Sequence, residues 1–250
     1  MYKVEAPKVL SPARGGLLPL ANVITQDAAI AAYHGVTYEA PAAGRSRTVP
    51  AAGVSKTFDK SEIVEGVEFG IYRGLDSALL MGTSTDQIAR DLFEGGETFA
   101  VEEAVQRLLL NPNAVDLTPT PGTPVTNVKA AVGLLSQYAA EQYTGLPLLH
   151  ANRYITELLD LEVDESNWTL HSQQGTPVAN GGGYGAEGPD ELEAGAGQGW
   201  LYISGQVNLW RGATDIVPAS DLKDNRHLVL AEAAYAATVD TFVAAILVGV

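Results

Sequence analysis

The residues with the clearest chemical pattern form a glycine-rich stretch, "NGGGYGAEG", at positions 180–188. Within it, residues 183–188 match the G-x-G-x-x-G spacing of a dinucleotide-binding turn. Such a turn needs a strand before it and a helix N-terminus directly after it, where free amides meet the pyrophosphate. Here "PDELE" and "AGAGQG" follow, which begin no apolar helical stripe and place carboxylates beside any phosphate. We therefore predict an accidental match and expect residues 181–199 to form a flexible, acidic, exposed loop.

Other motifs of catalysis or metal binding do not occur. No Gly-Lys pair exists for a phosphate-binding loop, and Ser204 in "YISGQ" lacks the first glycine of a nucleophile elbow. Cysteine is absent, and Glu102-Glu103 is interpreted as a solvated helix face. The histidines have no metal-ligand spacing and are expected to act independently; they are His34, His150, His171 and His227. The sequence thus predicts no catalytic, cofactor-binding or metal-binding residue and no enzyme, with an unrecognised small-molecule-binding enzyme left open as an alternative.

Charge is distributed unevenly along the 250 residues. The net charge is −15, but residues 1–60 hold seven basic against four acidic side chains, so the remainder carries −18. An acidic body repels free nucleic acid, which argues against sequence-specific DNA reading. A weakly basic arm on an acidic body is suited to lie across a neighbouring copy, although a solvated surface explains the same charges.

Two terminal stretches bear on targeting. The first sixteen residues have no apolar core of a signal peptide. Near the C-terminus, "LVLAEAAYAATVDTFVAAILVGV" is long enough to span a bilayer, but Glu232 and Asp240 lie inside it. We expect buried strands there instead.

The first third of the chain predicts an arm, a strand and a long helix. Residues 1–56 are rich in Pro, Gly and Ala and lack helical periodicity. "GVEFGIY" alternates as a half-buried strand. A capping box at 84–87 and an apolar stripe predict one helix over 85–110, with Gly95-Gly96 as the place for a kink and Asn111-Pro112 as its end.

The rest of the chain predicts two more helices and then strands. Thr123-Pro124 is interpreted as an N-cap with proline at the first helical position, and Gly145 as the stop. The stripe of this helix comprises Val128, Ala131, Val132, Leu135 and Ala139. A shorter helix is expected after Pro147, carrying Ala151, Ile155, Leu158 and Leu159 on one side. From residue 166 the strand candidates are "WTLH", "TPVAN", "WLYISGQVNLW", "HLVLAEAAYAA" and "TFVAAILV".

This order of elements resembles that of the major capsid proteins of tailed phages, with the Hong Kong phage capsid fold, and most closely those of phages infecting actinobacteria. The segments that carry the resemblance are "VEEAVQRLLL", "LLSQYAAEQYTGLPLLHANRYITELL", "SQQGTPVANGGGY", "LYISGQVNLWRG" and "LAEAAYAATVDTFVAAILV". They are packing patterns, and their shared order along most of the chain is what the resemblance rests on.

The resemblance implies an α+β chain divided into an N-terminal arm (1–39), an extended loop with strands (40–72), a spine helix and P-domain (73–122), an A-domain (123–215) and returning P-domain strands (216–250). It implies pentamers and hexamers of an icosahedral head around double-stranded DNA, in a virion assembled in the host cytoplasm. An encapsulin-type nanocompartment shell is the alternative. The implied partners are other copies of the chain, scaffold, portal and decoration proteins, and DNA contacted non-specifically, with no membrane.

Two further expectations concern contacts between copies. The extended loop, about 40–66, would lie over a neighbour's spine helix; Lys56 and Lys60 fall in it, but no crosslink is assigned to them because no partner asparagine or acid matches a motif. The apolar arm residues are expected to pack on an adjacent subunit rather than on their own; they are Val9, Leu10, Leu17, Leu18, Leu20, Val23 and Ile24.

Overall fold

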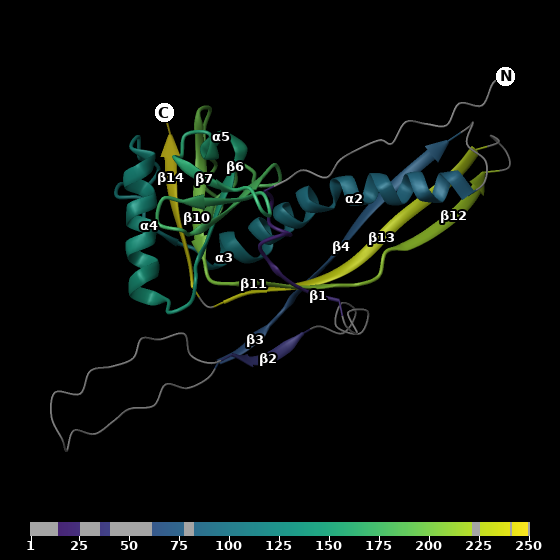
Figure 1. Ribbon diagram of the computed structural model, residues 1–250, viewed down its shortest axis with the longest axis horizontal. Coiled ribbons are helices and arrows are strands. Elements are labelled where there is room, and N and C mark those ends of the chain that lie inside the picture. The colour runs from purple at the N-terminus through teal and green to yellow at the C-terminus, as the bar shows by residue number, and fades with distance from the viewer. Residues whose placement is uncertain are drawn as a thin grey trace, which may run out of the picture.

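The computed structural model describes residues 15–25, 36–40, 62–77, 83–221, 226–240 and 242–249 (Figure 1). Five of the residues discussed above, Val9, Leu10, His34, Lys56 and Lys60, lie outside these ranges. The described residues form mixed helices and sheets, which confirms the α+β class.

A five-stranded sheet forms one half of the fold. Its strands are β1 (Asn22–Ile24), β4 (Val67–Ser77), β11 (Val207–Arg211), β12 (Asp215–Asp221) and β13 (Arg226–Val239). The long β13 is central, antiparallel to β4 along one side and to β11 and β12 along the other, and β1 joins β11 in parallel. The predicted alternation in β4 is confirmed, because Ile71 is buried between the exposed Gly70 and Tyr72.

A seven-stranded sheet forms the other half. In spatial order its strands are β5 (Val115–Asp116), β14 (Val243–Gly249), β10 (Gln198–Ser204), β6 (Leu148–Asn152), β9 (Pro177–Gly181), β8 (Thr169–Ser172) and β7 (Leu161–Asp164). A separate ribbon pairs β2 (Thr37–Ala40) with β3 (Glu62–Glu65) and extends away from both sheets (Figure 1). All the strand candidates from residue 166 onward are confirmed.

The apolar C-terminal stretch forms strands and not a membrane span. It contributes β13 to one sheet and β14 to the other, and every residue of β14 is buried. Within the described ranges, no helix has the length and apolar character needed to cross a bilayer.

One long helical segment lies along the five-stranded sheet against β4 and β13 (Figure 1). It consists of α2 (Thr83–Val105), the π-helical turn η1 (Gln106–Leu110) and α3 (Asn111–Asn113). The predicted helix is confirmed with ends shifted by two or three residues. Helical hydrogen bonding runs through Gly95-Gly96, the expected place for a kink, without a break. The irregularity lies instead at η1. Such wider π-helical turns are frequent at functional sites.

Two expectations about the remaining helices are wrong in detail. Helix α4 (Val128–Gln142) begins after Asn127, whose side chain accepts the Ala130 amide, so the cap is not Thr123-Pro124; the helix also ends before Gly145. The helix expected after Pro147 is instead strand β6 followed by the short α5 (Arg153–Thr156). Residues 148–151 are buried throughout, and a strand buried on both faces loses the period that separates it from a helix.

The seven-stranded sheet separates two hydrophobic clusters. One fills the space between α2, the five-stranded sheet and one face of the seven-stranded sheet, and includes Phe93, Val105, Trp200 and Tyr235. The other lies between α4 and the opposite face and includes Leu135, Leu149 and Ile155. Both faces of the central strands β6, β10 and β14 are therefore covered, as their near-continuous burial requires.

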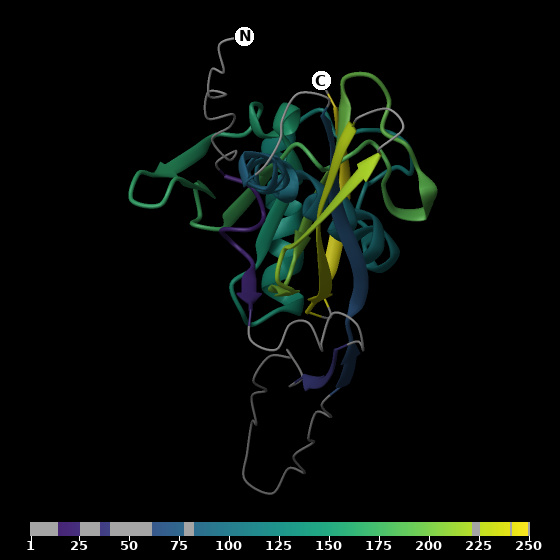
Figure 2. The same ribbon diagram turned by 90° about the vertical axis from the view of Figure 1, so that its right-hand side faces the viewer.

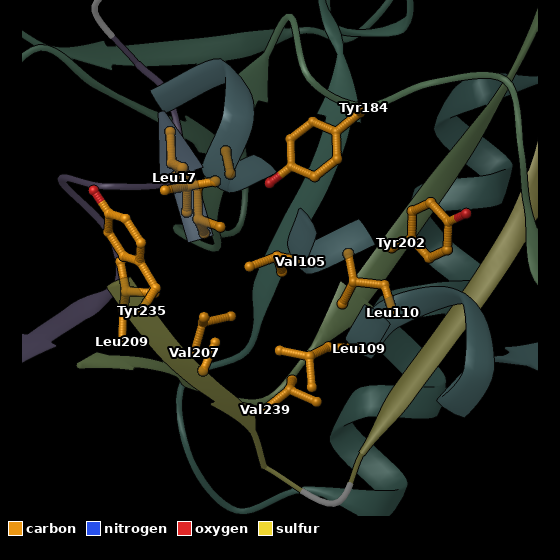
Figure 3. Close-up of a cluster of buried hydrophobic side chains, with 14 of the residues drawn as sticks. Leu17, Val105, Leu109, Leu110, Tyr184, Tyr202, Val207, Leu209, Tyr235 and Val239 are labelled. Atoms are coloured by element: carbon orange, nitrogen blue, oxygen red, sulfur yellow. The ribbon is translucent and has the colours of Figure 1, made fainter. Parts of the chain in front are cut away.

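The expectation that arm residues pack only on another copy is wrong for residues 15–21. Leu17 is fully buried within its own chain, in the same cluster as Val105 and Tyr235 (Figure 3), and Leu18 and Leu20 pack against that cluster. Strand β1 then pairs with β11 of the same chain, leaving Val23 37% exposed. We call residues 15–25 the docked arm. Its burial reflects a specific tertiary pocket, which local composition does not encode.

Candidate functional site

Three buried polar side chains on one helical segment form the centre of the site. Glu97, Glu102 and Gln106 are at most 6% exposed. Glu97 binds the five-stranded sheet, and Glu102 and Gln106 both bind the glycine-rich loop. In the described residues, no buried side-chain nitrogen or oxygen lacks a hydrogen-bond partner. Such fully satisfied networks specify a unique arrangement of the segments they join.

Glu102 joins the docked arm to the glycine-rich loop. One carboxylate oxygen accepts the Leu17 amide at 3.0 Å and the other accepts the Gly183 amide at 3.0 Å. Burial raises the pKa of Glu102, an effect opposed by these two hydrogen bonds and by the charge of Arg153. The interpretation of Glu102-Glu103 as a solvated face is therefore wrong for Glu102, which is 1% exposed, whereas Glu103 is exposed.

Three glycines make this close approach possible. A Cβ atom at Gly16 or Gly181 would overlap the Glu102 carboxylate, and one at Gly183 would overlap the Phe99 carbonyl oxygen in α2. Backbone can thus reach the helix only where side chains are missing. Within the pattern at 183–188, Gly183 allows close packing on the helix and Gly188 allows close packing on the Trp200 ring, which explains these two glycines without a nucleotide.

The expectation of a flexible, exposed loop at 181–199 is therefore wrong for its first part. Gly181, Gly183 and Tyr184 are buried, while the acidic residues of the second part are exposed. No helix follows the glycines; the nearest element is the three-residue η2 (Pro189–Glu191). Strand β9 thus precedes the glycines, but a three-residue helical turn follows them where a dinucleotide site has a helix.

Gln106 continues the contact with the same loop. Its amide oxygen accepts the Gly185 amide at 2.6 Å, and its amide nitrogen donates to the Glu187 carbonyl at 2.7 Å. The Tyr202 hydroxyl donates to Asn111 at 2.6 Å nearby, and burial raises the pKa of Tyr202. Gln106, the first residue of the π-helical turn, thus binds the loop that follows β9 of the seven-stranded sheet.

Glu97 fixes α2 to the five-stranded sheet. Arg211 of β11 donates two bonds to its carboxylate, Nε to Oε1 at 2.5 Å and Nη2 to Oε2 at 3.1 Å, and the Tyr235 hydroxyl donates to Oε1 at 2.6 Å. The hydrogen bonds to Glu97 raise the pKa of Arg211, and burial raises that of Tyr235. The forked geometry is the strong form of an ion pair.

His150 is buried between two hydroxyl groups in the seven-stranded sheet. Its Nδ1 lies 2.9 Å from the Tyr184 hydroxyl and its Nε2 lies 2.8 Å from Ser204 Oγ. Burial lowers the pKa of His150 to about 3, so the ring is neutral near pH 7. Ser204 donates onward to the Gly205 carbonyl at 2.7 Å. Because both ring nitrogens face hydroxyl groups, no carboxylate orients His150 as a general base.

The structure does not bring together the three histidines that lie in its described ranges. His171 lies in β8 and His227 in β13, on separate sheets from one another, and neither contacts His150. Among the described residues, no three His, Asp or Glu side chains form a metal-binding group. A cavity of about 280 Å³ beside Glu102 is lined by glycines, Phe99 and Arg153, among others. The hydrogen bonds of this site join helix α2 to the docked arm and to the glycine-rich loop.

Sequence reasoning missed the three polar residues because polar side chains on a helix are normally solvated. The only sequence signal is that Glu102 and Gln106 are four residues apart, on one line of the helix beside the apolar stripe. Leu17 and Gly183 are 85 and 81 residues from Glu102, so nothing local indicates that they meet it.

Comparison with solved structures shows which fold this is. The capsid of Ralstonia phage GP4 superposes with a TM-score of 0.62 at 8% identity, covering 100% of this chain and 95% of that one. This is the fold of tailed-phage capsid proteins. A chain of Microbacterium phage Oxtober96 gives a TM-score of 0.57 at 13% identity, covering 98% and 95%. The capsid of an empty GTA particle gives 0.56 at 12%, covering 100% and 95%.

The capsid fold is thus confirmed, and the similar structures include chains from phages of actinobacteria. No protein-family model matches the sequence, and a search of curated proteins returns no match. The long helical segment and the ribbon that leaves the body both belong to the expected architecture of the capsid fold.

Proposed function

We propose that this chain is the major structural subunit of a tailed-phage head, assembling as pentamers and hexamers into an icosahedral shell around double-stranded DNA. The observation that carries the proposal is the end-to-end match: solved capsid chains cover 100% of this chain while being covered to 95% themselves. A chain that shares the whole fold of solved capsid chains fits a structural role. Its location is then the virion, after assembly in the host cytoplasm.

The division into capsid domains is also a proposal. The arm is 1–39, the extended loop 40–72, the spine helix and P-domain 73–122, the A-domain 123–215, and the returning strands 216–250. The five-stranded sheet with α2 supports a P-domain, and the seven-stranded sheet with α4 supports an A-domain. Three strands depart from these bounds: β11 lies in the five-stranded sheet, β14 lies beside β10 in the seven-stranded sheet, and β5 pairs with β14 in that same sheet.

The contacts expected of such a subunit are with its own copies, through the loop at 40–66. Scaffold, portal and decoration proteins and non-specifically held DNA are further proposed partners. The charge of −15 favours DNA contact through local basic groups rather than through the surface as a whole.

Expression of the full chain and negative-stain electron microscopy tests the proposal. Icosahedral particles or ring-shaped capsomers are expected. Small discrete oligomers at every protein concentration would overturn a shell function. Denaturing electrophoresis of the particles then reports whether subunits are covalently joined, because monomer-sized bands exclude a crosslink.

A further inference from the structure

An exposed tryptophan is held at the tip of a rigid hairpin. Trp168 lies in the turn between β7 and β8, is 51% exposed and has a φ of 60°. The left-handed region is unfavourable for a bulky residue. The hairpin projects from the body of the molecule (Figure 2).

The turn that holds Trp168 is closed by hydrogen bonds. The Trp168 amide donates to the Asp164 carbonyl at 2.7 Å, and the Asp164 carboxylate accepts the Ser166 amide at 2.9 Å. Asn167 accepts the Thr169 amide at 3.0 Å. Hydrogen bonds to Ser166 lower the pKa of Asp164, so this tip carboxylate is ionised near pH 7. A rigid, amphipathic aromatic side chain loses little entropy on binding.

A cleft with an apolar floor, suited to an apolar ring, lies at the base of the same hairpin. It has a volume of about 150 Å³ between α4 and the hairpin, with an aliphatic floor of Val132, Leu149, Leu159 and Leu161. At its mouth, no atom lies within 4 Å of where a Cβ of Gly133 would be. An aliphatic cavity of roughly 150 Å³ accommodates a benzene ring. The cleft therefore suits an aromatic side chain.

The charge at the cleft mouth complements the hairpin tip. Lys129 Nζ lies 3.1 Å from Asp160, with both side chains more than half exposed, and such a pair contributes little. Gln173 also donates to Asp160 at 2.8 Å, so Asp160 keeps a partner if Lys129 turns away. Lys129 is thus free to pair with a carboxylate that accompanies the incoming ring, and the hairpin turn carries Asp164 and Glu165.

We infer that Trp168 of one copy inserts into the α4 cleft of a second copy, with Lys129 pairing to Asp164 or Glu165 of the incoming hairpin. This contact deepens the proposed shell function and rests on it. Because tip and cleft are different patches, one subunit can give its tip to one neighbour and its cleft to another, and this head-to-tail arrangement generates a ring when the rotation closes. It would therefore connect successive subunits within a capsomer.

Disulfide trapping tests the contact directly, since the natural chain contains no cysteine. Glu165→Cys at the tip and Ser136→Cys at the cleft are made in separate full-length chains, mixed, and oxidised. Ser136 lines the cleft. A disulfide-linked heterodimer is expected. Gln142→Cys, exposed at the far end of α4, is the matched control and should give no more than background linkage to Glu165→Cys.

The outcomes separate this contact from the shell function. Shells without the heterodimer, or equal linkage to position 142, would overturn the contact and leave the shell function standing. The heterodimer without shells or capsomers would support the contact and overturn the shell function. If neither the heterodimer nor shells or capsomers form, both the contact and the shell function are overturned.

A second variant separates the contact from folding. Trp168→Gly removes the ring and relieves the positive φ, so the monomer should unfold at an unchanged or higher denaturant concentration. The midpoint concentration for capsomer formation should rise at least about tenfold, as for loss of an interface hot spot. Leu146→Ser, 69% exposed and outside cleft and hairpin, is the control and should leave that midpoint unchanged. An unchanged midpoint for Trp168→Gly would overturn the contact.

Discussion

At the scale of single residues, two buried ionisable groups show how the fold handles charge. Glu97 forms an ion pair with Arg211 and accepts a hydrogen bond from the Tyr235 hydroxyl. His150 has hydroxyl neighbours only and is held neutral. The same burial that strengthens an ion pair removes the charge of a group without one.

Removing Arg211 should be costly because it leaves Glu97 buried beside a tyrosine. We expect Arg211→Met to lower the free energy of unfolding by about 3 kcal/mol, the usual cost of breaking a buried pair. Urea unfolding measures it. Arg226→Met is the control, since Arg226 and Asp76 form an ion pair with side chains 51% and 43% exposed, and the expected loss is below about 1 kcal/mol. Equal losses in both variants would contradict the assignment.

His150 should make the protein less stable in acid. Its pKa is about 3 when folded and about 6.5 when unfolded, so only the unfolded chain takes up a proton between these values. The stability it contributes is present above pH 6.5 and is lost as the pH falls. Relative to His150→Gln, wild type should lose about 2 kcal/mol between pH 7 and pH 5. Parallel stability curves for the two proteins would show that His150 titrates normally.

At the scale of elements, the glycine-rich loop packs against α2 through its backbone rather than through side chains. Gly181 and Gly183 end a strand and cross the helix in direct contact with Glu102 and Phe99. The loop follows a strand of the seven-stranded sheet, whereas the helix packs on the five-stranded sheet. These glycines therefore set the distance between the two halves of the fold.

Gly183→Ala should destabilise the protein although alanine is the smallest replacement. Its Cβ meets backbone that cannot move aside, and we expect a loss of about 1–3 kcal/mol in urea unfolding. Gly133→Ala, with open space on the exposed side of α4, should instead stabilise by about 0.5–1 kcal/mol through helix propensity. Effects of the same sign would refute this account of Gly183.

At the scale of the whole molecule, the docked arm and the glycine-rich loop share one acceptor. Leu17 and Gly183 donate to opposite oxygens of Glu102, so each helps to hold the carboxylate that the other needs. Segments linked through a common group have coupled stabilities.

This coupling predicts that damage to the arm is felt in the loop. Leu17→Ala should cost about 2–5 kcal/mol and speed amide exchange at Gly183 and Gly185, and its cost should shrink in a Glu102→Gln background. Hydrogen exchange and a double-mutant cycle measure both effects. Leu135→Ala, equally buried but in the cluster under α4, should add to Glu102→Gln within about 0.5 kcal/mol. Additivity for Leu17 would exclude the coupling.

Local pattern was sufficient for much of the fold. The alternation in β4, the stripe of α2 and the β-rich runs after residue 166 predict the elements observed, because period and propensity are properties of neighbouring residues. The order of these elements also indicated the capsid fold, which the solved structures confirm. Local pattern was weakest where burial removes the period, as in β6, and at the Asn127 cap.

Sequence by itself determined the long helical segment, strand β4, the strands predicted by the β-rich runs after residue 166, and the absence of known catalytic motifs. Only the tertiary structure decided that Leu17 is buried in its own subunit and that Glu102 is a buried junction rather than a solvated acid. The physical reason is separation along the chain. A carboxylate is placed by amides more than 80 residues away, and its burial is favourable only once those amides have arrived.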